Sequence, residues 1–419
     1  MRYSFSYNYN DLDEWIDGED GAGRMAKRLV ATWMGAGLAA WVIAGSGCAE
    51  VRYYNTTAWV EKEGRVTTDP WVVRFMENNY YFPVRDVFDP HVLASLVDSS
   101  QPRAWDTNDG GDVPDGSFYV NRDLASITAA QAAAGAATAP PKPPWKVVKA
   151  RPAEKGTLAG FIGQDASGRK FVVKLDDPQH REAASAAVVI ASRLYWLLGY
   201  HVPAESVVTI TGTGVSDYDG RRGSASEFID GKILGPFTFD WFRYRREMRG
   251  LRVAAAWVDD VDRIASNTLV TFRDGRSYYY LIDFDGTLGL WQGRPKPVWM
   301  GHRHLWDPPW GVVNLVSLGR LEKGQIRRRC PFSPAVGIFF ADDFDPLAWK
   351  QEHPNSAFRF MTKADGRWMA EKIARITPEQ LRAIVHAANY SDPNDEDHVL
   401  TTLLERRGKI LQAFGVSGK

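Results

Sequence analysis

Short segments in the middle of the chain mix apolar residues with alternating polar ones, which is the pattern of β-strands. They cover residues 145–151, 157–162, 170–175, 207–210, 225–229 and 278–284. A polar turn with glycine at 165–168 separates the second segment from the third, which predicts a hairpin. We therefore expect a sheet in this part of the chain.

Apolar residues at helical spacing occupy longer segments. Residues 181–198 show this spacing and end at Gly199, a usual C-terminal stop. Residues 242–259 repeat the pattern, and the chain is mostly helical from about residue 345 onward. Residues 377–380 predict a capping box with proline at the first helical position. Together the strands and helices predict an α+β fold.

Residues 25–48 have the organisation of a signal peptide. A basic start precedes an uncharged apolar stretch at 29–45, and small residues lead to Cys48. This order resembles a bacterial lipoprotein signal, which implies lipidation at Cys48 and a mature chain that begins there. The match is incomplete, because Gly45 stands where such signals usually have leucine.

The start of the chain bears on this interpretation. Residues 1–24 are acidic and polar, which is a poor leader for export, so we expect translation to begin at Met25. An uncleaved membrane-anchoring helix is the alternative, although the apolar stretch is slightly short for a full span. Residues 1–48 are thus a predicted signal region. The protein is expected at the cell envelope, membrane-anchored and facing the periplasm or the exterior.

Two further segments precede the predicted sheet. Residues 49–128 contain turns of Asn, Asp and Gly, and their fold is not readable from the sequence. Residues 129–144 are rich in alanine and then in proline, a composition typical of a linker. We therefore expect a domain boundary there.

Composition excludes one class of partner. The 419 residues include 51 Lys and Arg and 51 Asp and Glu. Because nucleic-acid binding depends on a surplus of basic side chains, we expect no nucleic-acid partner. A hydrophobic content of 44% is ample for a sizeable core.

Phosphoryl transfer needs a lysine for the phosphates, a base and oxygen ligands for metal ions. Lys174 lies in the strand at 170–175, and Glu182 is at the start of the next helix. We expect these two to pair, and the turn with Gly156 and Thr157 to lie over phosphates. The alternatives are a lysine whose stem packs on a sheet edge and a glutamate that stabilises a helix start.

A second group of polar residues follows the helix at 242–259. Asp262 and Asn267 are separated as Asp-x-x-x-x-Asn, and Asp283 closes the next apolar strand. A candidate base and an amide ligand thus share one loop, and a carboxylate arrives at the end of the following strand. The spacing alone is common by chance, but together with Lys174 it indicates phosphoryl transfer.

A resemblance to a known family runs through several stretches, including DVPDGSFYVNR, FVVKLD, GSASEFIDGKILGPF, YYLIDFDGTLG and HPNSAFRFMTKAD. They resemble a family of exported bacterial proteins of uncharacterised activity with a kinase-like core. More remotely, the core is similar to HipA-type and phosphatidylinositol-kinase-like kinases. The resemblance covers about residues 105–414. It implies a two-lobed protein-kinase-like domain with an N-terminal extension, with an N-lobe at 145–230 and a C-lobe at 231–419.

The resemblance also implies roles for single residues. Lys174 would hold phosphates, Asp262 would be the catalytic aspartate, and Asn267 and Asp283 would bind magnesium. The residues implied beside adenine are Glu227, Phe228 and Ile229. The implied cofactors are ATP and Mg²⁺. The implied partners are a nucleotide and a protein or small-molecule acceptor that the sequence does not identify.

Three positions depart from those kinases. Asp260 stands where a histidine is expected, Val188 replaces an acidic residue on the helix, and Asp285 interrupts the motif Asp-Phe-Gly. These changes support an alternative in which the fold persists as a catalytically inactive, pseudokinase-type binding module.

A second alternative uses the same residues. The sequence LIDFDGTL also matches the signature of haloacid-dehalogenase phosphatases, in which Asp283 would be the nucleophile and Asp285 the acid and base. That fold requires crossover helices of a parallel sheet after the motif, and the gaps to later candidate motifs are short for them. The phosphatase is the weaker interpretation.

Overall fold

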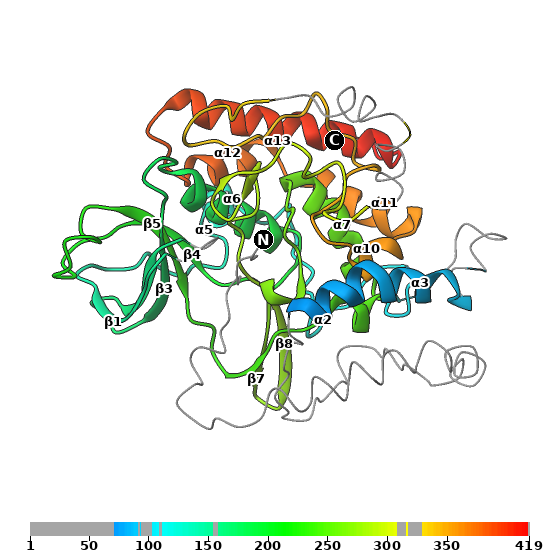
Figure 1. Ribbon diagram of the computed structural model, residues 1–419, viewed down its shortest axis with the longest axis horizontal. Helices are drawn as coiled ribbons and strands as arrows, with labels where there is room; N and C mark the ends of the chain where they lie inside the picture. Colours follow the sequence, from blue (N-terminus) through cyan, green and yellow to red (C-terminus); the bar gives the residue numbers. More distant parts are fainter. Residues whose placement is uncertain are drawn as a thin grey trace.

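The computed structural model describes residues 71–90, 93, 103–108, 111–153, 158–307, 316 and 329–417. The predicted signal region with Cys48, and Gly156 and Thr157 of the predicted turn, lie outside the described residues. Among the described helices, none has the length and apolar character needed to span a membrane. The described chain forms two lobes, one built on a sheet and one mostly helical (Figure 1).

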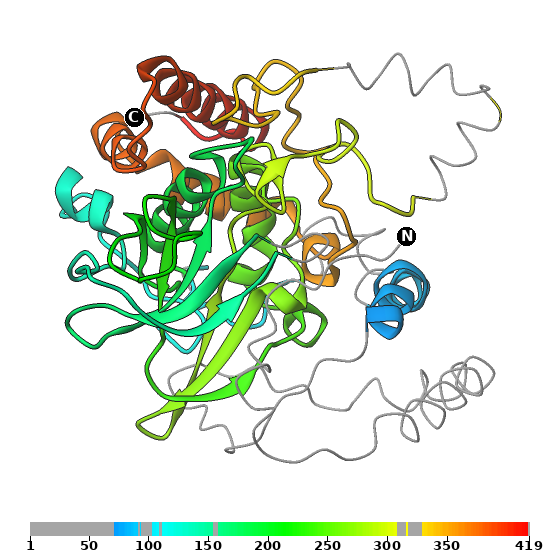
Figure 2. The ribbon, with the colours of Figure 1, turned by 60° about the vertical axis from the view of Figure 1, so that its left-hand side comes forward.

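The first lobe contains a five-stranded antiparallel sheet with the order β1-β2-β3-β5-β4, which Figure 2 brings forward. Its strands are β1 (Lys146–Arg151), β2 (Gly160–Gln164), β3 (Lys170–Leu175), β4 (Glu205–Thr209) and β5 (Arg222–Glu227). Trp145, Phe161 and Phe171 are buried together in its core. The predicted helix at 181–198 is confirmed as α6 (Ala183–Leu197), which packs against β4 and β5.

The second lobe is arranged around helix α7 (Arg246–Val258), against which α10, α11 and α13 pack. The small side chains of Ala254, Ala255 and Ala256 are fully buried, which lets these neighbours approach closely. The later helices are α10 (Ser356–Arg359), α11 (Lys363–Ala374), α12 (Pro378–His386) and α13 (Pro393–Ala413). The predicted capping box is confirmed at the start of α12, where Thr377 and Gln380 each bond the other's backbone.

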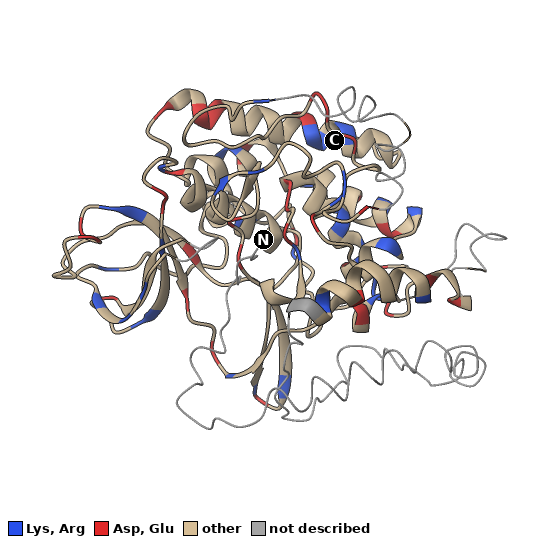
Figure 3. Cartoon of the chain, in the orientation of Figure 1, with Lys and Arg blue, Asp and Glu red and all other residues tan. Residues whose placement is uncertain are grey.

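Short elements complete the second lobe. The antiparallel strands β6 (Lys232–Gly235), β7 (Thr268–Arg273) and β8 (Arg276–Leu281) form a sheet in that order. The remaining pieces are the 3₁₀ turns η3 (Phe239–Phe242) and η4 (Ala265–Asn267) and the strand pair β9 (Leu290–Trp291) and β10 (Arg294–Pro295). Acidic and basic residues are interspersed along the chain in both lobes (Figure 3).

The segment predicted as a linker differs from that expectation in its first part. Residues Ala129–Ala134 form helix α5, which is capped by Thr128 and packs against α12. Ala132 is fully buried. A helix made almost only of alanine carries no contrast between an apolar and a polar face, so its sequence pattern does not separate it from a linker.

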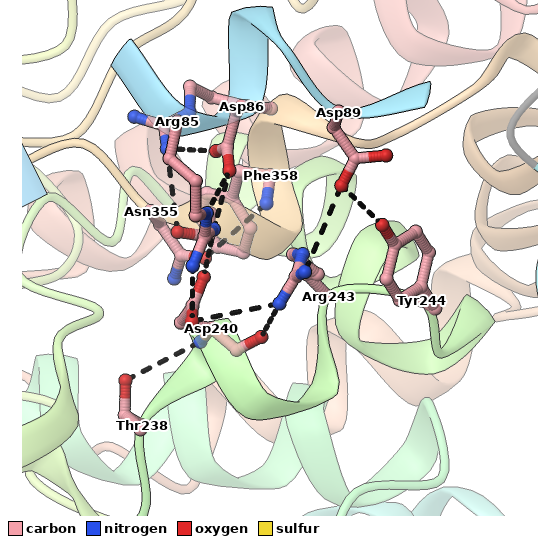
Figure 4. Close-up of polar contacts among 11 residues, drawn as sticks. Arg85, Asp86, Asp89, Thr238, Asp240, Arg243, Tyr244, Asn355 and Phe358 are labelled. Atoms are coloured by element: carbon pink, nitrogen blue, oxygen red, sulfur yellow. Dashed lines mark hydrogen bonds and ion pairs between the residues drawn. The ribbon is translucent and has the colours of Figure 1, made fainter. Parts of the chain in front are cut away.

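Residues before that helix also belong to the body of the protein. Phe118 and Tyr119 are buried in the core of the second lobe. Further upstream, α2 (Trp71–Met76), the π-turn η2 (Glu77–Tyr81) and α3 (Phe82–Val87) follow one another directly. Ion pairs hold α3: Arg85 lies 2.6 Å from Asp240, and Asp86 pairs with Arg359. Figure 4 shows the contact of Arg85 with Asp240.

Candidate active site

The ammonium group of Lys174 joins the two lobes. Lys174 stands on β3, and its Nζ lies 2.8 Å from Oδ1 of Asp283 and 2.6 Å from Oδ2 of Asp285. Both aspartates follow strand β8 of the second lobe. The three side chains are only 11%, 5% and 12% exposed, so each charge depends on the others for compensation.

Local backbone conformation explains how the two aspartates reach the lysine. Ile282 still donates its N–H to the carbonyl of Asn267, which continues the strand by one residue. Asp283 then adopts a left-handed conformation with φ of 57°, which turns the chain away from the sheet. Aspartate tolerates this region better than most residues. Burial, followed by the charge of Asp283, raises the pKa of Asp285 to about 6.

Asp262 and Asn267 lie on the loop that precedes β7. The side-chain amide of Asn267 donates to the carbonyl oxygen of Asp262 at 2.7 Å and to its Oδ2 at 3.1 Å. Burial, together with the charges of Glu352 and Asp283, raises the pKa of Asp262 well above its usual range. Gly286 allows the two loops to meet, because a Cβ added there would lie 3.0 Å from the Cβ of Asp262.

A buried arginine that the sequence analysis did not single out holds both loops together. Arg263 is 0% exposed and donates to backbone carbonyls of Asn267, Ile282 and Asp283, each at 2.8 Å. Its Nε donates to Oδ2 of Asp260 at 2.8 Å. The signal in the sequence was its position directly after Asp262, but its partners could be found only from the fold.

Asp260 therefore has a defined task in this structure. It accepts hydrogen bonds from Arg263 and, at 2.7 Å, from the hydroxyl of Tyr195 on α6. The pair Asp260 and Arg263 connects the loop of Asp262 to the loop of Asp283. The aspartate that replaces the expected histidine at this position is thus held by hydrogen bonds from Arg263 and Tyr195.

Glu182 does not take the expected place beside Lys174. Its carboxylate accepts a hydrogen bond from the N–H of Ser391 at 2.9 Å and lies 3.7 Å from Arg222. The reason is local: Asp176 accepts the N–H of Glu182 and caps the start of α6, and Glu182 adopts a left-handed conformation there. The expected Lys174–Glu182 pair is thus replaced by the ion pairs with Asp283 and Asp285.

A different glutamate lines the pocket beside Lys174. Glu205 on β4 is 3% exposed and accepts a hydrogen bond from the hydroxyl of Ser226 at 2.5 Å. Burial raises the pKa of Glu205 to about 8, although Lys174 acts in the opposite direction. Glu205 thus adds a buried carboxylate to this pocket from β4, which β5 separates from β3.

The residues expected beside adenine lie where β5 leaves the first lobe. The N–H of Glu227 donates to Ala204 and that of Phe228 donates to Lys170. Ile229 packs against the small cluster of Leu269, Tyr280 and Ile282. Both of these amide groups are therefore engaged with the protein itself.

Two cavities are candidates for a ligand-binding site. The larger, of about 190 Å³, lies in the second lobe, but its cations are already paired: Lys296 lies 2.6 Å from Asp259, and Arg406 donates to backbone carbonyls. The pocket between the lobes has only about 10 Å³ of free volume. It is lined by Lys174, Val188, Pro203, Glu205, Ser226 and Asp283. We place the site there because Lys174 and Asp283 line it.

The donor set fits magnesium. Oδ1 of Asn267 is buried and has no hydrogen-bond partner among the described residues, which is an oxygen ready for a cation. Magnesium commonly takes one or two carboxylates and completes its shell with water and phosphate. In the part of the chain that the structure describes, no group of three or more acidic, histidine or cysteine side chains is arranged to hold a metal.

Comparisons with known proteins give remote matches. No protein-family model and no curated protein matches the chain. The kinase CtkA of Helicobacter pylori matches with 12% identity and a TM-score of 0.38, over 64% of this chain and 94% of that one. HipA of Shewanella oneidensis MR-1 matches with 9% identity and a TM-score of 0.32, over 59% of each chain. A Golgi casein kinase matches with 12% identity and a TM-score of 0.25, over 65% and 75%.

These TM-scores are low, so we assign the fold from the arrangement of the strands, helices and loops in this chain. The chain has a two-lobed, kinase-like α+β fold. Its lysine stands on the third strand of an antiparallel sheet, a helix follows, and the acidic loops of the second lobe face the lysine. The phosphatase alternative requires a parallel sheet, whereas β8, the strand before Asp283, pairs antiparallel to β7.

The buried ion pair between Asp260 and Arg263 predicts that substitutions of these two residues have non-additive effects on stability. Arg263→Gln should cost about 3–5 kcal/mol because it leaves the Asp260 carboxylate buried without its cation. Asp260→Asn should also destabilise, and the double variant should cost clearly less than the two single losses together. Denaturant unfolding of the four proteins measures this coupling, and additive losses would show that the two side chains act independently.

The raised pKa of Glu205 predicts that the effect of this residue on stability depends on pH. Because the pKa of Glu205 is raised from 4.5 to about 8 on folding, its ionisation favours the unfolded chain, and its contribution to stability falls as the pH rises through this window. Glu205→Gln should therefore raise the melting temperature more at pH 8 than at pH 5. Glu371→Gln, in an exposed ion pair with Arg367, is the control, and equal shifts at both pH values for Glu205→Gln would contradict the prediction.

Proposed function

We propose that this protein is an ATP- and Mg²⁺-dependent phosphotransferase of the bacterial cell envelope. The observation that supports it most directly is the contact of Lys174 with Asp283 and Asp285, whose loop meets the loop of Asp262 and Asn267 at Gly286. A cation for phosphates, a carboxylate for a hydroxyl proton and oxygens for a metal thus lie on neighbouring segments, as phosphoryl transfer requires.

Each side chain has a distinct task in this proposal. Lys174 moves from the two aspartates to the phosphates of the nucleotide. Asp262 accepts the proton of the attacking hydroxyl, and the side-chain amide of Asn267 orients its carboxylate. Asn267 and Asp283 would hold magnesium, which supplies positive charge to the phosphates when bound. Arg263 keeps the two loops in register.

The small free volume of the pocket has a consequence for this mechanism. Lys174 occupies the space between the two aspartates, so nucleotide binding must be accompanied by opening of the lobes and a change of partners for the lysine. The same closed arrangement supports the second candidate function, a pseudokinase-type binding module that takes no nucleotide. The two functions differ in a single property, the binding of ATP together with magnesium.

Thermal unfolding with nucleotide separates the two functions. We expect millimolar ATP to stabilise the full-length protein in detergent only when Mg²⁺ is present, because ligands that bind the native state raise its stability. Asp283→Ala should abolish this shift by removing a metal ligand. Asp217→Ala, at an exposed position, should leave it intact. If neither ATP nor ATP with Mg²⁺ shifts the wild-type protein, the binding module is the better description.

The location is proposed on the sequence alone. The signal-like residues 25–48 and Cys48 support export and a lipid anchor. Compartments outside the inner membrane are generally poor in ATP, so an enzyme there depends on an unusual nucleotide supply or a different donor. Metabolic labelling with radioactive palmitate should label the wild-type protein and not Cys48→Ser, and equal labelling of the two would contradict lipidation at this cysteine.

A further inference from the structure

Glu205 is a buried acidic residue of the pocket between the lobes, and only one of its oxygens is hydrogen-bonded. Its side chain lines the pocket. Oε1 accepts the hydroxyl of Ser226, whereas Oε2 is buried and has no hydrogen-bond partner among the described residues. Because an unsatisfied buried polar atom costs stability, such an atom in a pocket indicates a partner that arrives in another state of the site.

The register of the sheet places Glu205 on the same face as Lys174. Glu205 pairs with Ser226 of β5, and Lys174 pairs with Ser224, two residues earlier on that strand. Paired residues of antiparallel strands share a face, as do residues two apart on one strand. All four side chains line the pocket, which agrees with this register.

The distance between the two strands is within reach of the two side chains. Strand β5 lies between β3 and β4. Two strand spacings and the offset of two residues separate the Cα atoms of Lys174 and Glu205 by roughly 12 Å. The extended side chains of a lysine and a glutamate together span this distance.

Helix α6 supplies no acidic side chain to the pocket. Its residue there is Val188, at the position where the sequence departs from an expected acidic residue. Glu182, at the start of the helix, is bonded to Ser391 instead. Of the described residues that line the pocket, Asp283 and Glu205 are the acidic ones. Glu205 is therefore the acidic side chain that the first lobe contributes.

Lys174 needs another partner when its aspartates are taken. Its Nζ contacts Asp283 and Asp285 in this structure, and the proposed function assigns Asp283 to magnesium. We propose that Lys174 then moves to Glu205, which holds its ammonium group against the phosphates. This inference rests on the proposed function, and Glu205 is a positioning residue in it. Lys174 thus has two alternative partners, the aspartates of the second lobe without nucleotide and Glu205 of its own lobe with nucleotide bound.

Affinity for nucleotide measures the contribution of Glu205. Without the carboxylate, Lys174 stays longer on the aspartates, and a smaller population of the binding state lowers the apparent affinity. Glu205→Gln should therefore bind ATP with Mg²⁺ about tenfold more weakly, as expected for the loss of a hydrogen bond between charged groups. Calorimetric titration of the full-length protein in detergent measures this, with Glu371→Gln as the unaffected control. Glu205→Gln is expected to be the more stable protein at pH 8, so a damaged fold does not explain weaker binding.

A double-mutant cycle tests whether Glu205 acts through Lys174. In the background of Lys174→Met, Glu205→Gln should change the dissociation constant by about twofold or less, because the lysine that it positions is gone. If Lys174→Met binds too weakly to titrate, an acyl phosphate of ATP reports the position of the lysine, since its acyl group forms an amide with Nζ as ATP leaves. At saturating reagent, Lys174 should be acylated about fivefold more slowly in Glu205→Gln than in Glu371→Gln.

The results separate this inference from the proposed function. If the wild-type protein binds ATP with Mg²⁺ and Glu205→Gln binds equally well, the inference is wrong and the phosphotransferase proposal stands. An equal loss of affinity in the Lys174→Met background, or equal rates of acylation, would also overturn the inference. If the wild-type protein does not bind ATP with Mg²⁺, the proposed function fails and the inference fails with it.

Discussion

One ammonium group compensates two buried carboxylates, and the relation between the lobes depends on it. Lys174 comes from the centre of the sheet, whereas Asp283 and Asp285 come from the second lobe. Because none of these charges is more than slightly exposed, each would be expensive to bury alone. With this contact in place, the pocket has only about 10 Å³ of free volume. A nucleotide with its metal ion would have to replace the contact between Lys174 and the two aspartates.

The acidic loops are presented to the lysine by a rigid support. Arg263 donates to carbonyls on both loops, and Asp260 is fixed between Arg263 and Tyr195. A buried hydrogen-bonded network of this kind holds its members in one arrangement. The site therefore combines the loops of Asp262 and Asp283, which Arg263 joins, with the side chain of Lys174, which reaches them from the other lobe.

Local patterns predicted much of the framework, and long-range pairings were the part they missed. Strand β3 and helix α6 followed from residue spacing, and the structure brings Lys174 into contact with Asp283 and Asn267 into contact with Asp262. The partner of Lys174 was misjudged because a capping interaction with Asp176 turns Glu182 away. The position of Arg263 depends on segments that meet only in the folded chain. Composition alone also could not distinguish the alanine helix α5 from a linker.

The most direct test is a crystal structure of the protein with Mg²⁺ and a non-hydrolysable ATP analogue. The account predicts magnesium about 2.1 Å from oxygens of Asp283 and Asn267, with Nζ of Lys174 moved from the aspartates to the phosphates and Arg263 unchanged. A structure in which the nucleotide lies elsewhere, and Lys174 stays on Asp283 and Asp285, would contradict it.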